Sequence, residues 1–212
     1  MGTPHSTTIL TVHSDNSADD REERALLAIL DASNQVYEVN CHNLNHKNHE
    51  DSVRNCVQLQ LRETVILGIR EQVKFLLAME EGESAVKKRF CYESDEKLDE
   101  HFDWYFKCVR PSSNYLINWL YMVDEDDMDK DRLEAKTEEF REMCHHLAHE
   151  LSIEEPFLGG REASIIDIVY YCDWTMTRKL LGAKRHWAPI EYPWKLNVWA
   201  EKMLEEFPTL EV

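Results

Sequence analysis

The chain has 212 residues, 43% of them hydrophobic, and its 41 acidic and 24 basic residues give a formal net charge of −17. A chain of this length can bury a core as one domain or as two small ones, so it is not a disordered tail. Its negative charge repels phosphate backbones and anionic lipid headgroups within a Debye length of roughly 10 Å, which excludes nucleic acid as an expected partner.

The six cysteines stand singly, with no C-x-x-C pair and no signal peptide: Cys41, Cys56, Cys91, Cys108, Cys144 and Cys172. This distribution favours reduced thiols in the cytoplasm or another reducing compartment. No apolar run reaches the roughly 18 residues that a membrane span needs. The opening MGTPHS matches the myristoylation pattern at Gly2. No basic patch supplies a second anchor, so membrane attachment is not expected.

The chain begins with alternating strand and helix patterns. Residues 7–13 are β-branched and apolar and predict a strand. Ser17 and Asp20 form a capping-box spacing before helically spaced apolar residues, which predicts a helix ending near residues 32–34. Residues 35–40 predict a second strand.

A hairpin and a helix complete the first half. After a polar stretch over residues 41–55, VQLQL (57–61) and TVIL (64–67) predict two paired strands. The following segment places Ile69, Val73, Leu76 and Leu77 on one side of a predicted helix.

From Glu83 onward only helical patterns follow. The predicted helices are separated by Pro111, Pro156, Gly182 and Pro189, and they cover residues 94–110, 112–124, 129–151, 164–181 and 193–206. The change of class at residues 80–84 predicts an α/β domain over residues 1–82 and an all-helical domain over residues 83–212.

This order of elements resembles the glutathione transferase (GST) architecture, a thioredoxin-like domain followed by a helical bundle. The segment FLGGREASIIDI (157–168) is similar to that family's loop and helix-capping segment, and EYPWKLNVWAEKMLEEFP (191–208) is similar to its closing segment. YEVN after the first helix adds to the likeness, which covers most of the chain.

Ser164 and Asp167 have the spacing of a structural helix cap. The Ser164 hydroxyl can accept from the Asp167 amide while the Asp167 carboxylate reaches back, which satisfies amides at the helix start. Such a cap contributes about 1 kcal/mol. The helix that follows is apolar nearly all round, so we expect it to be buried.

The resemblance implies a cis-proline before the third strand, whose preceding residue binds glutathione. No proline lies between Pro4 and Pro111, and the matching positions are Val57 and Gln58. A cis bond before a residue other than proline costs about 2.5–4 kcal/mol, so a trans bond is expected here.

The resemblance also implies an acid or amide followed by serine at the start of the next helix, where the family holds the γ-glutamyl end. This chain has Gly68, Ile69 and Arg70 at that turn, with no serine in either possible register. These positions are interpreted as a vestigial glutathione site.

A third implied feature is a thiol-activating tyrosine, serine or cysteine near the end of the first strand. The tyrosine position falls on Val12, which leaves Ser14 and Ser17 as candidate hydroxyls. The fourth feature is positive potential at that place, but three acids surround it: Asp15, Asp19 and Asp20. Nearby negative charge disfavours a thiolate, and Ser17 is better explained as a helix cap.

Three clusters resemble metal sites only in part, and no metal is predicted. Two are rich in histidine but match no closed zinc pattern: Cys41, His42, His46 and His49, and Cys144, His145, His146 and His149. The third places acids at calcium-loop positions, but Arg132 occupies the glycine position: Asp127, Asp129, Asp131 and Glu138. A solvated loop, a surface patch and an acidic helix start explain them more simply.

These observations predict a catalytically silent GST-like protein without a cofactor, a structural or interaction subunit of a multi-subunit complex or of a GST-like dimer. The alternative is an active or glutathione-binding transferase that uses Ser14 or Ser17, and a metal- or calcium-responsive protein is a third possibility. Most of the six tryptophans are expected in the core, and an exposed aromatic cluster would mark a partner surface.

Overall fold

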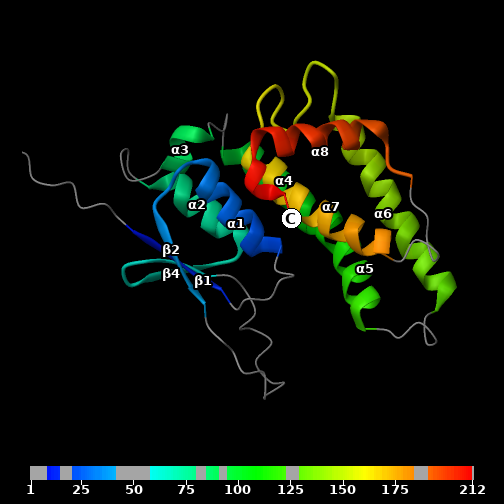
Figure 1. Ribbon diagram of the computed structural model, residues 1–212, viewed down its shortest axis with the longest axis horizontal. Helices are drawn as coiled ribbons and strands as arrows, with labels where there is room; N and C mark the ends of the chain where they lie inside the picture. The colour runs from blue at the N-terminus through cyan, green and yellow to red at the C-terminus, as the bar shows by residue number, and fades with distance from the viewer. Residues whose placement is uncertain are drawn as a thin grey trace, which may run out of the picture. The chain divides into compact units, whose positions relative to one another are not determined.

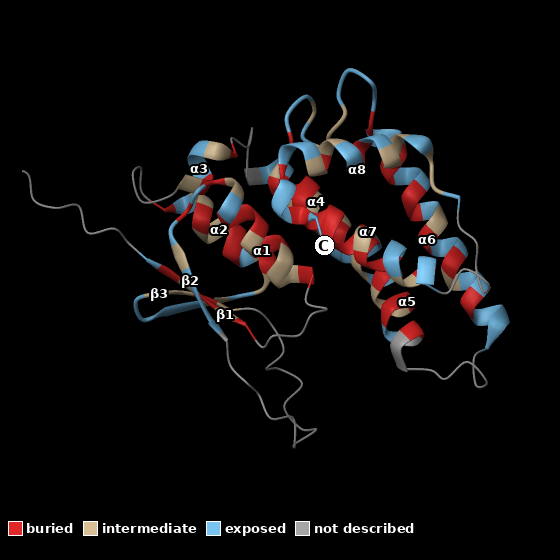
Figure 2. Cartoon of the chain, in the orientation of Figure 1, coloured by how far each residue is buried: buried red, intermediate tan, exposed pale blue. Residues whose placement is uncertain are grey.

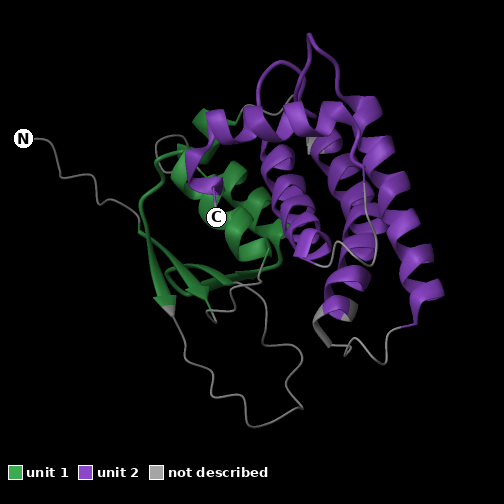
Figure 3. Cartoon of the chain, turned by 45° about the vertical axis from the view of Figure 1, so that its right-hand side comes forward, with its two compact units in different colours: residues 1–91 green, residues 92–212 purple. Residues whose placement is uncertain are grey.

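The computed structural model describes residues 9–14, 21–41, 58–79, 85–90, 95–122, 129–183 and 191–211. The chain forms two compact units, residues 1–91 and residues 92–212 (Figure 3). Each unit buries its own hydrophobic core, as a structural domain does.

In its described residues, the first unit contains a four-stranded mixed sheet and three helices (Figure 1). Its elements are β1 (Leu10–Ser14), α1 (Arg21–Ala32), β2 (Tyr37–Cys41), β3 (Gln58–Leu61), β4 (Thr64–Leu67), α2 (Ile69–Ala78) and α3 (Ala85–Arg89). The sheet order is β2-β1-β3-β4, in which β1 pairs parallel with β2 and antiparallel with β3, and β3 pairs antiparallel with β4. The predicted β-α-β-x-β-β-α order is therefore confirmed.

The core of this unit lies between one face of the sheet and the helices α1 and α2 (Figure 2). Side chains alternate between the faces of a strand, and in β1 the side chains of Leu10, Val12 and Ser14 are buried. Fully buried residues of the two helices meet that face: Leu26, Ile29, Leu30, Ile69, Val73 and Leu76. The opposite face of the sheet is mixed: Thr11 Oγ1 donates to Glu38 and His13 Nε2 lies 2.6 Å from Gln60 Oε1, while the apolar Val65 and Leu67 are exposed on the same face.

Helix α3 was not predicted, and it belongs to the first unit. Val86 is fully buried, and the Ala85 amide donates to Gln35 Oε1 over 2.9 Å. Since α3 packs against α1 and α2, the division lies after residue 91 rather than after residue 82.

The second unit is a helical bundle. Its elements are α4 (Asp95–Trp104), the π-helix η1 (Tyr105–Val109), α5 (Arg110–Met122), α6 (Lys130–Glu150), α7 (Ile165–Ala183), α8 (Trp194–Glu206) and the short 3₁₀ turn η3 (Pro208–Leu210). Helix α7 is its centre, because thirteen of its 19 residues are buried (Figure 2). The predicted buried helix is thereby confirmed.

The predicted helix break at Pro111 is wrong. Helices α4, η1 and α5 follow one another without interruption from Asp95 to Met122. Proline lacks an N–H group, and its ring collides with the carbonyl four residues earlier in a regular α-helix. Here the Arg110 amide donates to the Tyr105 carbonyl five residues earlier, so the helix is already widened where Pro111 enters it.

Across the described segments, no helix combines the length and apolar character that crossing a bilayer demands.

Candidate functional site

Ser14, one of the two candidate catalytic hydroxyls, ends β1 and is only 2% exposed. It lies on the same buried face as Leu10 and Val12. A hydroxyl that activates a bound thiol must lie within hydrogen-bond reach of that thiol, so burial opposes this role for Ser14. Ser17, Asp15, Asp19 and Asp20 lie outside the described residues.

Gln58 begins β3 and pairs in register with His13 and Leu67. Paired residues share a face of the sheet, so its side chain lies with His13 and Leu67 on the face opposite the core. Val57 is outside the described residues, and the expected trans bond between Val57 and Gln58 stays a prediction.

The first turn of α2 contains Gly68, Ile69 and Arg70. Gly68 is the N-cap at φ +78°, a backbone conformation that glycine adopts easily, and it offers no side chain to a ligand. The Ile69 side chain is fully buried, and that of Arg70 is half-buried. Glu71 is exposed in this turn, where its charge already occupies the positive end of the helix dipole. The turn therefore provides no hydroxyl for a bound carboxylate.

The capping residues Ser164 and Asp167 are in contact, and the Asp167 carboxylate is fully buried. Its Oδ2 atom accepts from the Ser164 amide at 2.9 Å and the Ser164 hydroxyl at 2.6 Å, and the Asp167 amide lies 3.4 Å from Ser164 Oγ. Three further donors come from elsewhere: Leu158 N at 2.8 Å, Gly159 N at 3.3 Å and Trp199 Nε1 at 2.9 Å. One carboxylate thus joins the start of α7 to the preceding loop and to α8.

The paired glycines serve this junction. A Cβ atom at Gly159 would lie 2.7 Å from Ser164 Cβ, so a larger residue would push the loop off the cap. Gly160 has φ +98°, which most other residues rarely adopt. The segment that precedes α7 therefore has a structural role: it packs against the cap at the start of that helix.

Sequence reasoning missed a second buried acid, Asp173, in the middle of α7. Its carboxylate accepts from the Tyr105 hydroxyl and from Ser113 Oγ, the latter at 3.0 Å, and Arg110 Nη1 lies 3.7 Å away. Arg110 also donates to the Tyr105 hydroxyl at 2.9 Å. Burial, reinforced by the Asp173 charge, holds the pKa of Tyr105 well above its usual value. The sequence signal that could have indicated it is an acid, Asp173, within an otherwise apolar helical segment.

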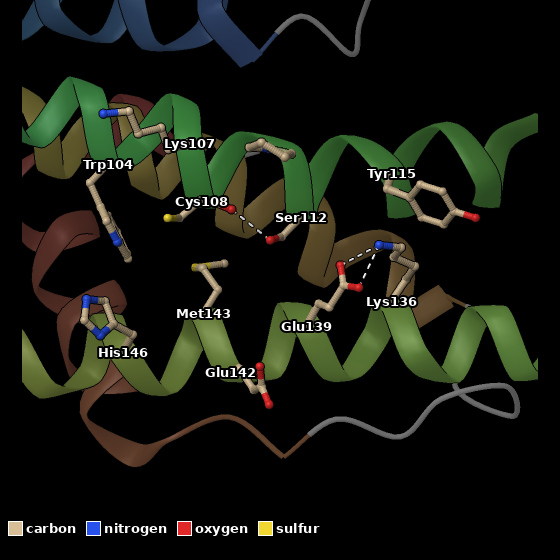
Figure 4. Close-up of a pocket in the computed structure, with 11 residues that line it drawn as sticks. Trp104, Lys107, Cys108, Ser112, Tyr115, Lys136, Glu139, Glu142, Met143 and His146 are labelled. Atoms are coloured by element: carbon tan, nitrogen blue, oxygen red, sulfur yellow. Dashed lines mark hydrogen bonds and ion pairs between the residues drawn. The ribbon is translucent and has the colours of Figure 1, made fainter.

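The second unit also contains a groove with a volume of about 700 Å³ between η1–α5 and α6 (Figure 4). At one end the Trp104 and His146 rings lie 5.1 Å apart, and at the other Lys136 Nζ donates to Glu139 and stands 5.1 Å from the Tyr115 ring. The remaining lining residues are Lys107, Cys108, Pro111, Ser112, Glu142 and Met143.

Cys108 is exposed, and Figure 4 shows its thiol between the two helices beside Met143. The groove combines this accessible nucleophile with aromatic rings and balanced charges, and no sequence pattern indicated it.

The three clusters that resemble metal sites in part are only partly described. Cys144 is buried in α6, whereas His145, His146 and His149 are exposed on it. Asp129 is the N-cap of α6 and accepts from the Arg132 amide at 3.1 Å. Four residues of these clusters, His42, His46, His49 and Asp127, lie outside the described residues. Among the residues that are described, no three His, Cys, Asp or Glu side chains gather as a metal site.

Neither a protein-family model nor a curated protein sequence matches the chain. Solved structures match nearly all of it. A theta class glutathione S-transferase from the citrus canker pathogen Xanthomonas axonopodis pv. citri, with glutathione bound, has 17% identity and a TM-score of 0.67 over 96% of this chain and 95% of the other.

Two further structures agree with this match. Ure2p in complex with glutathione has 12% identity and a TM-score of 0.72 over 99% and 94% of the two chains. The apo form of human glutathione-S-transferase T1-1 has 14% identity and a TM-score of 0.71 over 93% and 84%. The chain therefore has the glutathione transferase fold, a thioredoxin-like α/β unit followed by a helical unit.

Proposed function

We propose that this chain is a catalytically silent protein of GST fold that works as an interaction or structural subunit of a larger assembly. The observation that carries the proposal is the first turn of α2. Gly68 has no side chain and Ile69 is fully buried, so neither offers a hydroxyl or an amide to the γ-glutamyl end that the family holds here. The exposed acid Glu71 is followed by Gln72 rather than by a serine.

The burial of Ser14 supports the same proposal. An enzyme that activates a thiol needs a hydroxyl within about 2.6–3.2 Å of the sulfur. Ser14 is 2% exposed and belongs to the face of β1 that builds the core. A chain that keeps the fold but lacks an accessible hydroxyl at Ser14 and a polar side chain at Gly68 and Ile69 fits a role in which the fold presents a binding surface to other proteins.

Two of the matching structures contain glutathione, which favours the alternative of a glutathione-binding or active transferase. In that case Ser14 or Ser17 would supply the hydroxyl. Glutathione would here be a substrate or ligand rather than a resident cofactor.

Binding and turnover measurements on the full chain separate the two functions. Titration calorimetry with reduced glutathione is expected to show no binding heat, and 1-chloro-2,4-dinitrobenzene is expected to be conjugated no faster than in buffer. Turnover that is lost in Ser14→Ala or Ser17→Ala, with glutathione binding, would overturn the proposal. Each variant is checked for an unchanged unfolding transition.

The assembly itself is tested by gentle affinity purification from the native source. We expect at least one other protein to co-purify in a fixed ratio through size exclusion. A monomer that carries no partner under these conditions contradicts the proposed role.

A further inference from the structure

Helix α8 has one face in the core and an opposite, exposed face that combines large apolar residues with acids. Leu196, Trp199, Ala200 and Met203 are buried. Trp194 is 59% exposed and Val198 is 37% exposed. Glu201 and Glu205 continue the exposed side of the helix (Figure 2 shows α8).

These four exposed residues form one stripe. They are spaced by four, three and four positions, and at about 100° per residue they fall within roughly 60° of the helix circumference. This is the spacing of successive d and a positions along the seam of a coiled coil. We call Trp194, Val198, Glu201 and Glu205 the α8 stripe.

Residues other than Trp194 hold α8 in the bundle. Trp199 and Trp174 are both 1% exposed and pack edge to face, with ring centroids 5.8 Å apart. The helix is also held by Trp199 Nε1 on Asp167 and by Lys195 Nζ, which donates to the Leu151 carbonyl over 2.6 Å. A tryptophan that is exposed on a fixed helix is the residue type most often found at the energetic centre of protein interfaces.

The negative charge around the stripe favours a partner with a basic surface. Glu191, Glu201, Glu205 and Glu206 belong to α8 or stand just before it, against the two basic residues Lys195 and Lys202. A second copy of this chain carries the same acids and the same net charge of −17, so it would be repelled. The complementary surface is apolar opposite Trp194 and Val198 and basic opposite the two glutamates.

We propose that the α8 stripe docks an amphipathic helix of a partner protein, with apolar side chains against Trp194 and Val198 and Lys or Arg against Glu201 and Glu205. The inference rests on the proposed interaction function and adds the surface and the partner's chemistry. Helices that meet along a d–a seam cross at about 20°, and each inserts side chains between those of the other.

The test uses the full chain with an N-terminal tag as bait in the native source, followed by cross-linking and peptide mapping. The recovered partner is then purified, and its dissociation constant is measured with four variants. Trp194→Ala and Glu205→Lys alter the stripe. Ile153→Ala, at a loop residue that is 84% exposed, and Glu134→Lys, at an exposed acid of α6, are the matched controls.

Trp194→Ala is expected to weaken binding about 30-fold or more, as for a central aromatic anchor. Glu205→Lys is expected to weaken it about 5-fold or more, and raising salt from about 0.05 to about 0.5 M should shrink that difference by screening. The controls are expected to stay within about twofold of wild type, and the cross-links should map to a Lys- or Arg-rich amphipathic helix.

The outcomes separate the two proposals. A partner that binds all four variants equally, or cross-links through an acidic or non-helical segment, overturns the α8 stripe and leaves the interaction function standing. Self-association that Trp194→Ala abolishes contradicts the basic partner and identifies a second copy as the occupant. Recovery of no partner at all contradicts both proposals.

Discussion

Replacing Asp167 with asparagine should destabilise the helical unit far more than a change of one atom implies. Oδ1 accepts from Leu158 N and Trp199 Nε1, and Oδ2 accepts from Gly159 N, Ser164 N and Ser164 Oγ. An amide keeps only one of the two oxygens and turns an NH₂ group toward the other set of donors. Two or three buried charge-assisted hydrogen bonds are therefore lost.

We expect this loss to lower the free energy of unfolding by about 3 kcal/mol, within the range of roughly 3–5 kcal/mol for breaking a buried charged contact. Ser164→Ala removes only the hydroxyl of the cap and should cost about 1 kcal/mol. For a chain of this size, about 3 kcal/mol corresponds to a fall in melting temperature of about 6–12 °C.

Urea unfolding followed by intrinsic fluorescence measures this change in the helical unit specifically. All six tryptophans lie in residues 92–212, so their emission reports that unit. Glu134→Gln, at an exposed acid on α6, is the control and should stay within about 0.5 kcal/mol of wild type. An Asp167→Asn protein as stable as this control would refute the argument that the carboxylate holds the junction.

Further predictions concern the other buried and exposed groups of the helical unit. Tyr105→Phe removes the hydroxyl that donates to Asp173 and should lower the unfolding free energy by about 1–3 kcal/mol in the same urea assay; no change would mean that the network is dispensable. Burial raises the pKa of the Cys144 thiol to about 12, and since the unfolded thiol ionises near its ordinary pKa of 9.0, stability should fall as pH rises above 9. Cys144→Ala should flatten that fall between about pH 9 and 11 in urea titrations, and an unchanged slope would assign it to other groups. Brief treatment with iodoacetamide and peptide mapping should alkylate the exposed Cys108 long before the buried Cys144 and Cys172; equal labelling would contradict the described burial.

Local patterns predicted most of the secondary structure. The strands of the hairpin were found within one residue, because alternation in QLQL and TVIL and the turn between them are written in adjacent positions. The cap formed by Ser164 and Asp167 was likewise predictable, because both residues lie within four consecutive positions. Helix α3 escaped notice because AVKKR is five residues long with one buried position, Val86. Such a segment is too short to show a period.

The features that the sequence did not reveal depend on contacts between distant residues. The helix passes through Pro111 because η1 precedes it and because Asp173, sixty residues beyond Ser113, holds the segment in place. The groove forms where Cys108 and Met143 approach from different helices. The additional donors to Asp167 come from a loop and from α8, which no capping-box spacing could indicate.

The π-helix η1 takes up one residue more than a regular turn of the same helix would. It spans five residues and closes with the Arg110 amide on the Tyr105 carbonyl. Deleting one residue there would close the wide turn into regular α-helical winding and leave the residues beyond it close to their present faces. It would also bring the Pro111 ring against the carbonyl four residues earlier, which costs about 3 kcal/mol or more in an α-helix. The extra residue of η1 is therefore what lets one continuous helix contain Pro111 while Ser113 still reaches Asp173.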